Sequence, residues 1–460
     1  MHSFARGASY ATRLALLAFS PLLLRARLAD AWLAPLAGGM FDALRRSLVP
    51  VLAALAFLVA LVPAASASQR KTRDVLVVSN NWGGNADLID PQTFERLDRI
   101  NVIPDKTKRI AEIEADPTAK FYFESIRELV GEGHNQYVDD GFTSRDGRLV
   151  YFSRPSFADV VALDLKSHRI VWRRHVDGYR ADHMALSPDG RRLLVSASTA
   201  NVVDELDTRT GRITRTFPSG DSPHENNYSR DGRTIFHASI GRVYTADDDP
   251  PVESINSAES SKGRRVFEEV DARTFAVTKT IDMGQKLAEA GHPDMSPAVR
   301  PMAISPDERS VYFQVSFLFG IVEYDSAMDR VVGVLDLPLG DAAGIPRTDF
   351  LLDSAHHGLA MNPQGTKLCV AGTMSGYAAI VRREPFELQS VTHVGHVPYW
   401  SMSSADGRYC FVSVARDDRV SVISYRTGKQ VARIKVGFHP QRMRTGVIRS
   451  GYLDSQGRRA

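Results

Sequence analysis

Short runs of alternating apolar and polar residues follow one another along most of the chain, with turn residues between them. Six of these runs share the same position after a polar turn: "RLVYFS", "RLLVSA", "TIFHAS", "SVYFQV", "KLCVAG" and "YCFVSV". They are rich in β-branched and aromatic residues and too short for ordinary helices. The pattern therefore predicts an all-β protein made of many short strands.

The turn before each run has nearly the same sequence each time. The six copies are "SRDG" at Ser144, "SPDG" at Ser187, "SRDG" at Ser229, "SPDE" at Ser305, "NPQG" at Asn362 and "SADG" at Ser404. Successive copies lie 43, 42, 76, 57 and 42 residues apart, so the two longer gaps contain insertions. The Ser or Asn side chain can bond the local backbone, and Gly accepts a left-handed conformation. A period near 40 residues with only strand-like segments predicts a β-propeller.

A second kind of turn precedes the last strand of each unit. There is one more turn of this kind than of the first kind. These turns begin at Asp90, Asp164, Asp207, Asp271, Asp325, Arg382 and Ser424. The unit that begins near Val75 therefore lacks its inner strand, and the segment "GFHPQRMRTGVI" at 437–448 is a spare strand. We expect this segment to complete blade one and close the ring. The prediction is a seven-bladed β-propeller over residues 74–448, followed by a tail at 449–460.

The repeat resembles that of a known family. "SPDGRRLLVS" followed by "VDELDTRTGRI" is similar to the YVTN-type seven-bladed propeller repeat of exported bacterial proteins, and the resemblance extends over essentially all of the chain from Asp74 to Ile448. That broad group includes surface-layer proteins, lactonases and the propeller parts of nitrous oxide reductase and cytochrome cd1 nitrite reductase. The resemblance implies the fold, and it leaves the function open.

The first 67 residues differ from the rest. Arg45 and Arg46 precede an apolar run at 48–62, which is followed by Ala65-Ser66-Ala67. This order is typical of a secretory signal peptide cut after residue 67, with Met40 as an alternative start. The run is shorter than the ~20 apolar residues of a membrane span. We expect export to the periplasm or the extracellular space without a membrane span, or a membrane anchor if the signal stays uncleaved.

Composition and cysteine content narrow the function classes. The net charge is +3 and the basic residues are scattered, which argues against nucleic acid as a partner. The chain has no Gly-rich phosphate loop and no G-x-S-x-G motif. Its two cysteines, Cys369 and Cys410, could pair in an exported protein. Period-two counting from the turn glycines places them on opposite strand faces, which favours two buried free thiols and leaves pairing open.

Four insertions interrupt the repeat, at 104–133, 243–265, 284–299 and 338–353. In a propeller, the connections between blades and those between the second and third strands lie on the same face, so all four insertions should lie together. Long connections are often functional. "DKTKRIAEIE" and "FYFESIRELV" in the first insertion have helical spacing and predict a helical lid. Asp247 to Asp249 in the second insertion would suit calcium, although a mobile polar loop is the favoured interpretation.

The inner strands begin at the same face, and their first residues are unusually polar. Alignment on the turn glycines gives one pair per blade: Asp139 and Asp140, Asp182 and His183, His224 and Glu225, Arg300 and Pro301, His357 and Gly358, Tyr399 and Trp400, and Gln441 and Arg442. Facing blades bring such residues to short range at the channel mouth. His134, His292, His356, His396 and His439 are expected near the same face.

Three interpretations of this ring compete. In the first, His183, His224 and His357 bind copper, zinc or iron, with Asp182 or Glu225 assisting, as in a redox or hydrolytic enzyme. In the second, the ring is a pocket for a small anion, sugar or lactone, with Arg300 and Arg442 as anchors and Tyr399 and Trp400 as stacking walls. In the third, water fills the channel and the insertion-bearing face binds a protein partner. The sequence favours a binding or scaffold role and does not decide whether the protein is an enzyme.

Overall fold

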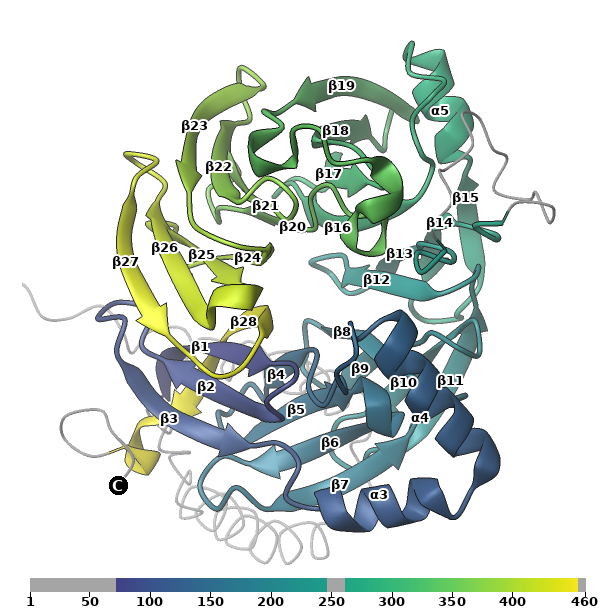
Figure 1. Cartoon of the computed structure of the whole chain (residues 1–460), viewed down its shortest axis with the longest axis vertical. Coiled ribbons are helices and arrows are strands. Elements are labelled where there is room, and N and C mark those ends of the chain that lie inside the picture. The colour runs from purple at the N-terminus through teal and green to yellow at the C-terminus, as the bar shows by residue number, and fades with distance from the viewer. Residues whose placement is uncertain (1–71, 246–260, 454–460) are drawn as a thin grey trace, which may run out of the picture. The chain divides into compact units, whose positions relative to one another are not determined.

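The computed structural model describes residues 72–245 and 261–453. The expected signal peptide, residues 247–249 of the second insertion and residues 454–460 of the tail lie outside the described residues. Seven four-stranded antiparallel sheets are arranged in a ring, as Figure 1 shows. The prediction of an all-β seven-bladed propeller is therefore confirmed.

The strands of each blade are given from the centre of the ring outward. Blade one contains β28 (Pro440–Arg449), β1 (Thr72–Asn80), β2 (Asn85–Ile89) and β3 (Arg96–Asn101). Blade two contains β4 (Gly141–Thr143), β5 (Leu149–Arg154), β6 (Asp159–Asp164) and β7 (Ile170–His175). Blade three contains β8 (Ala181–Leu186), β9 (Arg192–Ala197), β10 (Val202–Asp207) and β11 (Ile213–Pro218). Blade four contains β12 (Pro223–Tyr228), β13 (Thr234–Ser239), β14 (Phe267–Asp271) and β15 (Val277–Ile281).

The remaining three blades follow the same order. Blade five contains β16 (Val299–Ile304), β17 (Ser310–Val315), β18 (Gly320–Asp325) and β19 (Arg330–Asp336). Blade six contains β20 (Gly358–Met361), β21 (Lys367–Gly372), β22 (Tyr377–Arg382) and β23 (Glu387–His393). Blade seven contains β24 (Pro398–Ser403), β25 (Tyr409–Val414), β26 (Arg419–Ser424) and β27 (Gln430–Lys435).

Blade one is closed by the C-terminal strand, as predicted. β28 pairs antiparallel with β1 from Thr72 opposite Arg449 to Asn80 opposite Pro440. The inner strand of blade one thus comes from the opposite end of the chain from its three other strands. This pairing removes two free sheet edges and closes the ring.

The repeated turns have the local bonding that their sequence predicts. In the first copy, Ser144 Oγ lies 2.7 Å from Asp146 Oδ1 and accepts a bond from the Leu149 amide at 2.9 Å. Gly147 follows with a φ of +64°, in the left-handed region that favours glycine. The second turns use an Asp in a similar way: Asp90 Oδ1 accepts from the amides of Gln92 and Thr93. Side-chain oxygens therefore fix both turns of the repeat.

The hydrophobic core is divided among the interfaces between neighbouring blades. Seven clusters of buried apolar residues join successive blades, and the last one joins blade seven to blade one. Each strand faces one neighbouring blade with its odd residues and the other neighbour with its even residues. Consequently the middle strands are buried on both faces, which explains near-continuous apolar runs such as "LCVAG".

The two cysteines form a disulfide between blades six and seven. Cys369 on β21 and Cys410 on β25 have Cα atoms 6.4 Å apart, and both side chains are fully buried. The expectation of two free thiols is therefore wrong. The cysteines do lie on opposite faces of their strands, but neighbouring blades pack with opposite faces in contact. A disulfide between two neighbouring blades therefore requires its two cysteines to lie on opposite faces of their strands.

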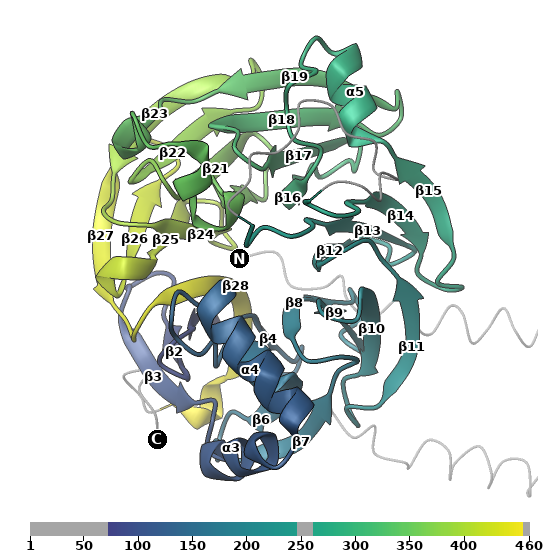
Figure 2. The ribbon, with the colours of Figure 1, turned by 45° about the vertical axis from the view of Figure 1, so that its right-hand side comes forward.

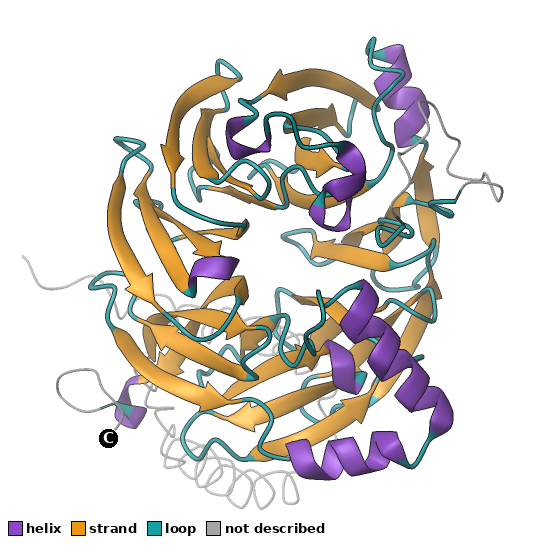
Figure 3. Cartoon of the chain, viewed as in Figure 1, coloured by secondary structure: helices purple, strands orange, loops and turns teal. Residues whose placement is uncertain are grey.

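Apart from η6, which follows β28 near the C-terminus, the helices lie in the connections on one face of the ring, as Figures 2 and 3 show. The first insertion forms α3 (Lys106–Glu114) and α4 (Pro117–Leu129), and Asp116 caps α4 by accepting bonds from the amides of Thr118 and Ala119. The third forms α5 (Met283–Glu289). The 3-10 turns are η1 (Pro155–Phe157), η2 (Gly340–Ala342), η3 (Arg347–Asp349), η4 (Leu351–Asp353), η5 (Ala415–Asp417) and η6 (Ser450–Tyr452). Within residues 72–245 and 261–453, no helix is both long and apolar enough to span a membrane.

Buried ion pairs hold the first insertion against blade two. The guanidinium of Arg154 is fully buried and bonds both Asp105 and Asp159. Arg109 of α3 lies 3.2 Å from Asp159 and donates a bond to the Phe157 carbonyl. These contacts fix α3, and α4 follows after a two-residue connection. α4 is consequently held over blades two and three, with its C-terminal end nearest the centre of the ring (Figure 1).

Candidate functional site

Each blade contributes at least one residue to the floor of a pocket on the insertion-bearing face, and blade one contributes both Gln441 and Arg442. Apart from Arg442, the floor residues are the first members of the seven pairs aligned by sequence: Asp139, Asp182, His224, Arg300, His357, Tyr399 and Gln441. The alignment placed both members of every pair at the channel mouth; the first member of each pair lines the pocket, and of the second members only Arg442 does. Because the inner strands converge on the ring centre, residues that are far apart in the sequence come together here.

Irregular pairing of the inner strands explains why two successive residues can face the channel. In a regular strand, neighbouring side chains point to opposite faces. The pairing of β8 with β9 shifts between Ala181 and Met184, which leaves Asp182 and His183 outside the register. Similar shifts occur in β12, β16 and β24 and between β1 and β28, at the site residues of those blades. Such bulges re-aim side chains and are common beside functional sites.

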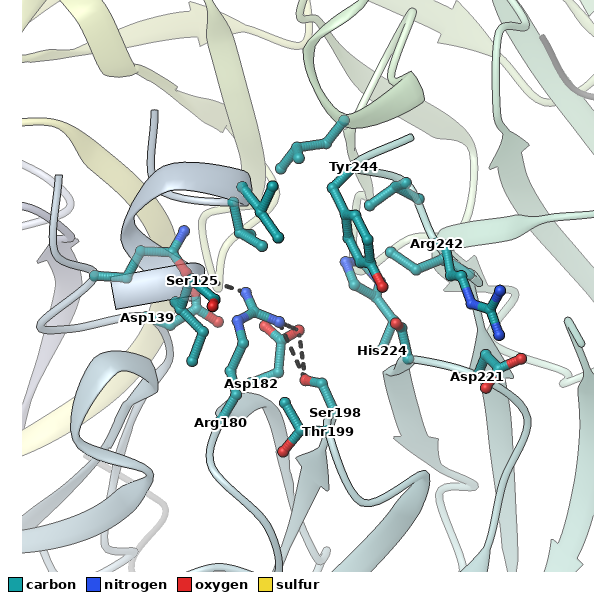
Figure 4. A pocket seen from close by; sticks show the side chains of 18 of the residues that line it. Ser125, Asp139, Arg180, Asp182, Ser198, Thr199, Asp221, His224, Arg242 and Tyr244 are labelled. Carbon is teal, nitrogen blue, oxygen red and sulfur yellow. Dashed lines mark hydrogen bonds and ion pairs between the residues drawn. The ribbon is translucent and has the colours of Figure 1, made fainter. Parts of the chain in front are cut away.

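The pocket has a cavity of about 300 Å³ with a polar floor and partly apolar walls. Its walls come from the insertions: α4 contributes Tyr122, Ile126 and Leu129, the connection after β13 contributes Val243 and Tyr244, and η4 contributes Leu352. Figure 4 shows Tyr244 and His224 on one side of the space and Arg180 with Asp182 on the other. The insertions thus turn the open mouth of the propeller into an enclosed pocket.

Three imidazoles converge at the floor or directly beneath it: His224 and His357 line the pocket, and His183 does not. His183, His224 and His357 each offer one ring nitrogen, and these atoms all lie within 4.8 Å of one another. The ring centres of His183 and His224 are 3.6 Å apart, and those of His224 and His357 are 5.5 Å apart. All three residues are at most 5% exposed. The sequence prediction named these three histidines together, and the structure brings them together.

Each imidazole has a buried nitrogen with no hydrogen-bond partner among the described residues. These atoms are His183 Nε2, His224 Nδ1 and His357 Nδ1. Burial lowers the pKa of each of these three histidines well below its ordinary value, and the nearby charge of Arg442 lowers it further. The three rings are therefore neutral at physiological pH, which is the form that binds metal ions.

Two carboxylates of the floor are held by arginines. Asp139 Oδ2 accepts a bond from Arg442 Nε at 2.8 Å. Asp182 is bonded by Arg180 and by Ser198 Oγ, and its Oδ1 lies 3.8 Å from His183 Nε2. Burial raises the pKa of Asp139 to about 6, although Arg442 opposes this shift. Asp139, Asp182 and His183 form a second group whose ligand atoms lie within 4.8 Å of one another.

Glu225 supports the cluster from below the floor. Its Oε2 lies 2.9 Å from Nδ1 of His183, and its Oε1 accepts a bond from Asn227. This contact occupies Nδ1 and leaves Nε2 of His183 for another partner. Burial raises the pKa of Glu225 to about 7, while Arg444 and Arg442 oppose the shift. Glu225 also lines a separate cavity that contains residues of the turn-bearing face, such as Arg230.

Trp400 has different surroundings from those expected, whereas Arg300 and Tyr399 line the pocket. Trp400 was predicted as a stacking wall, but it lines the cavity of Glu225 and lies outside the insertion-side pocket. The Arg442 guanidinium stacks over its ring at 4.3 Å. Arg300 lines the pocket as expected, and it bonds the hydroxyls of Ser316 and Ser354. Tyr399 lies beside His357, with ring centres 4.4 Å apart.

The other histidines of this face do not join the cluster. His134 and His439 stack on the two sides of Trp82, with ring centres 3.9 and 3.4 Å away. His356 bonds Ser375 and Tyr377, and the exposed His396 bonds Asp417. His292 follows α5 and does not line the pocket. Trp82 therefore packs between His134 and His439. The number of histidines expected near this face was larger than the number that join the cluster.

Several pocket residues were missed by the sequence alignment. Arg180 lies two residues before Asp182, just outside the aligned pair. Arg242 and Tyr244 lie in a non-repeating connection, and the α4 residues lie in an insertion. The helical spacing of the first insertion indicated a lid, but it could not show which helix residues face the pocket.

Comparisons with known proteins add little to this description. No family model matches the chain, and no curated protein matches it. The YVTN resemblance therefore stays a prediction. Among solved structures, the chain is similar to hydrazine synthase of Kuenenia stuttgartiensis, with 17% identity and a TM-score of 0.39 over 62% of this chain and 95% of that one. At this level the similarity carries no functional argument, and what stands is a seven-bladed β-propeller with a buried three-histidine cluster.

Proposed function

We propose that this protein is a metal-binding propeller that holds one transition-metal ion through His183, His224 and His357. The observation that carries the proposal is the convergence of three neutral imidazoles whose buried nitrogens lack partners among the described residues. Buried polar atoms are nearly always hydrogen-bonded, and leaving one unpaired costs about 1–3 kcal/mol. One metal ion would satisfy all three rings at once.

The surroundings of the histidines support this proposal. Metal-binding histidines usually donate their second nitrogen to a carboxylate, which fixes the ring orientation. Glu225 provides that contact to His183. Three imidazoles suit zinc or copper, and a three-histidine zinc site leaves a coordination position open for water or substrate. His224 and His357 line the pocket, so a small ligand in the pocket could reach an ion held by the cluster.

The disulfide supports the proposal that the protein is exported. Disulfides persist in oxidising compartments and are rare in the cytosol. The Cys369–Cys410 bridge is fully buried between two blades. Export to the periplasm or the extracellular space would also give the site access to metal ions outside the cytosol.

Elemental analysis of metal-stripped and reloaded protein tests the function. We expect one equivalent of copper or zinc in the wild type and loss of that equivalent in the His224→Ala, His357→Ala double variant. Two controls should keep it: His393→Ala, which removes an exposed histidine of blade six, and Arg230→Glu on the turn-bearing face. The proposal is wrong if the wild type binds no stoichiometric metal, or if the double variant binds as much.

A protein-docking role for the same face is the second candidate. Six large apolar side chains are exposed there: Phe121, Leu129, Tyr244, Leu339, Ile345 and Phe438. Exposed apolar side chains gathered on one face often mark an interaction surface. Cross-linking in the expressing cell would test it, because the Phe121→Glu, Leu339→Glu variant should lose an adduct of the wild type while keeping its metal content.

A further inference from the structure

The pocket above the histidines changes in chemistry from floor to mouth. The floor carries charged and polar groups from the inner strands. The walls carry Ile126 and Leu129 of α4, with Val243, Tyr244 and Leu352 opposite or beside them. A bound molecule would therefore meet polar groups at one end and apolar groups at the other.

Arg442 is the floor group most suited to an anion. Its side chain is only 2% exposed, and its Nε is used by Asp139. Its Nη1 is buried and has no hydrogen-bond partner among the described residues. Guanidinium groups bind carboxylates strongly because two N–H donors match two oxygens. A ligand carboxylate would satisfy this donor.

The charge balance of the pocket also favours an anion. Four arginines line it, namely Arg180, Arg242, Arg300 and Arg442, against three aspartates, Asp139, Asp182 and Asp221. The histidines add no charge in their neutral form. A divalent ion would add two positive charges in a buried position, where uncompensated charge is costly. An anionic ligand at the open coordination position would offset that charge.

We propose that the pocket binds a small amphipathic carboxylate, with its carboxylate between the metal ion and Arg442 and its apolar body against α4 and Tyr244. The inference rests on the proposed metal site, because the carboxylate completes the coordination of that ion. An aromatic or branched acid fits both ends of the pocket. Acetate has the carboxylate for the polar end of the pocket and lacks an apolar body for the other end.

Visible spectroscopy of the Co(II)-loaded protein tests the inference with phenylacetate as the probe. We expect phenylacetate to change the Co(II) absorption bands and to bind about 10- to 100-fold more tightly than phenylacetamide, which has the same shape and no charge. Acetate should bind more weakly than phenylacetate because it lacks the apolar body. This acid–amide comparison uses the wild-type protein and does not depend on any variant folding.

A matched pair of α4 variants tests the position of the apolar body. Leu129→Ala removes a wall residue that is 52% exposed and should weaken phenylacetate about 5- to 10-fold without changing acetate. Phe121→Ala removes a more exposed residue of the same helix that does not line the pocket, and should change neither. Arg442→Lys keeps the charge but not the paired donors, so it should weaken both acids while Co(II) still binds.

The outcomes separate the two proposals. If no Co(II) spectrum forms, the metal site itself is wrong. If a histidine-dependent spectrum forms but phenylacetate leaves it unchanged, the metal site stands and the carboxylate inference fails. Equal binding of the acid and the amide would also overturn it. Equal effects of Leu129→Ala and Phe121→Ala would show that the apolar body lies elsewhere.

Discussion

Reduction of the Cys369–Cys410 disulfide should destabilise the propeller by an amount that its loop length predicts. The bridge closes a loop with a sequence separation of 41 residues. In the chain-entropy treatment, such a loop removes about 13 cal/mol/K from the unfolded state, which is about 4 kcal/mol at 25 °C. The described propeller has about 370 residues, so its unfolding entropy is about 0.8 kcal/mol/K and the expected fall in Tm is about 5 °C.

The assay compares thermal unfolding of the oxidised wild type with that of protein unfolded in reductant and refolded under it. Complete burial of both sulfurs means that reductant alone should act slowly on the folded protein. The Cys369→Ala, Cys410→Ala variant is the matched control, because its Tm should not respond to reductant. A wild-type shift below about 1 °C, or an equal shift in the double variant, would refute the loop-entropy argument.

Three further predictions concern closure, acid stability and metal binding. Deletion of residues 437–460 should abolish cooperative unfolding, because blade one loses β28. A synthetic 437–453 peptide should restore cooperative unfolding. A truncated protein that melts like the wild type would contradict ring closure. Burial lowers the pKa of His237 to about 3, so the unfolded chain takes up that proton below pH 6.5 and stability falls as pH falls. The wild type and His237→Asn should therefore differ in their free energy of unfolding by about 2–3 kcal/mol less at pH 4.5 than at pH 7.5, which chemical denaturation at both pH values would measure. A difference that is the same at both pH values would contradict this prediction. Zinc at 1,000 times its Kd should stabilise the wild type by about 4 kcal/mol in thermal melts, and the His224→Ala, His357→Ala variant should show no shift.

The fold could be predicted from the sequence because the propeller repeats its turns. Ser144 and its counterparts fix a local bonding pattern that depends on only a few adjacent residues. The surplus second turn at Asp90 then required a missing inner strand, and only the segment at 437–448 could supply it. Both steps use local sequence, so they did not need knowledge of long-range packing.

The disulfide and the pocket walls could not be predicted in the same way. The faces of Cys369 and Cys410 were assigned correctly, but the conclusion required knowing that neighbouring blades contact through opposite faces. Leu129 and Tyr244 lie in insertions without repeat counterparts, so no alignment could place them. Trp400 was assigned to the mouth because alignment on the turn glycines pairs it with Tyr399, and the irregular pairing of β24 decides which of the two lines the pocket.

The inner-strand irregularities explain why chemistry gathers at this position of the fold. In a regular inner strand, successive side chains would point toward the two neighbouring blades, and only the edge of the strand would face the channel. The shifts in β8 and β12 allow His183, from the second position of its pair, to reach the level of His224, from the first. His183, a second member of its pair, can therefore converge with His224 and His357, which are first members of theirs. Restoring regular pairing should therefore separate them: deletion of Pro223, which borders the β12 shift, should abolish metal binding even though all three histidines remain. Retention of full binding would show that the bulge is not what positions the site.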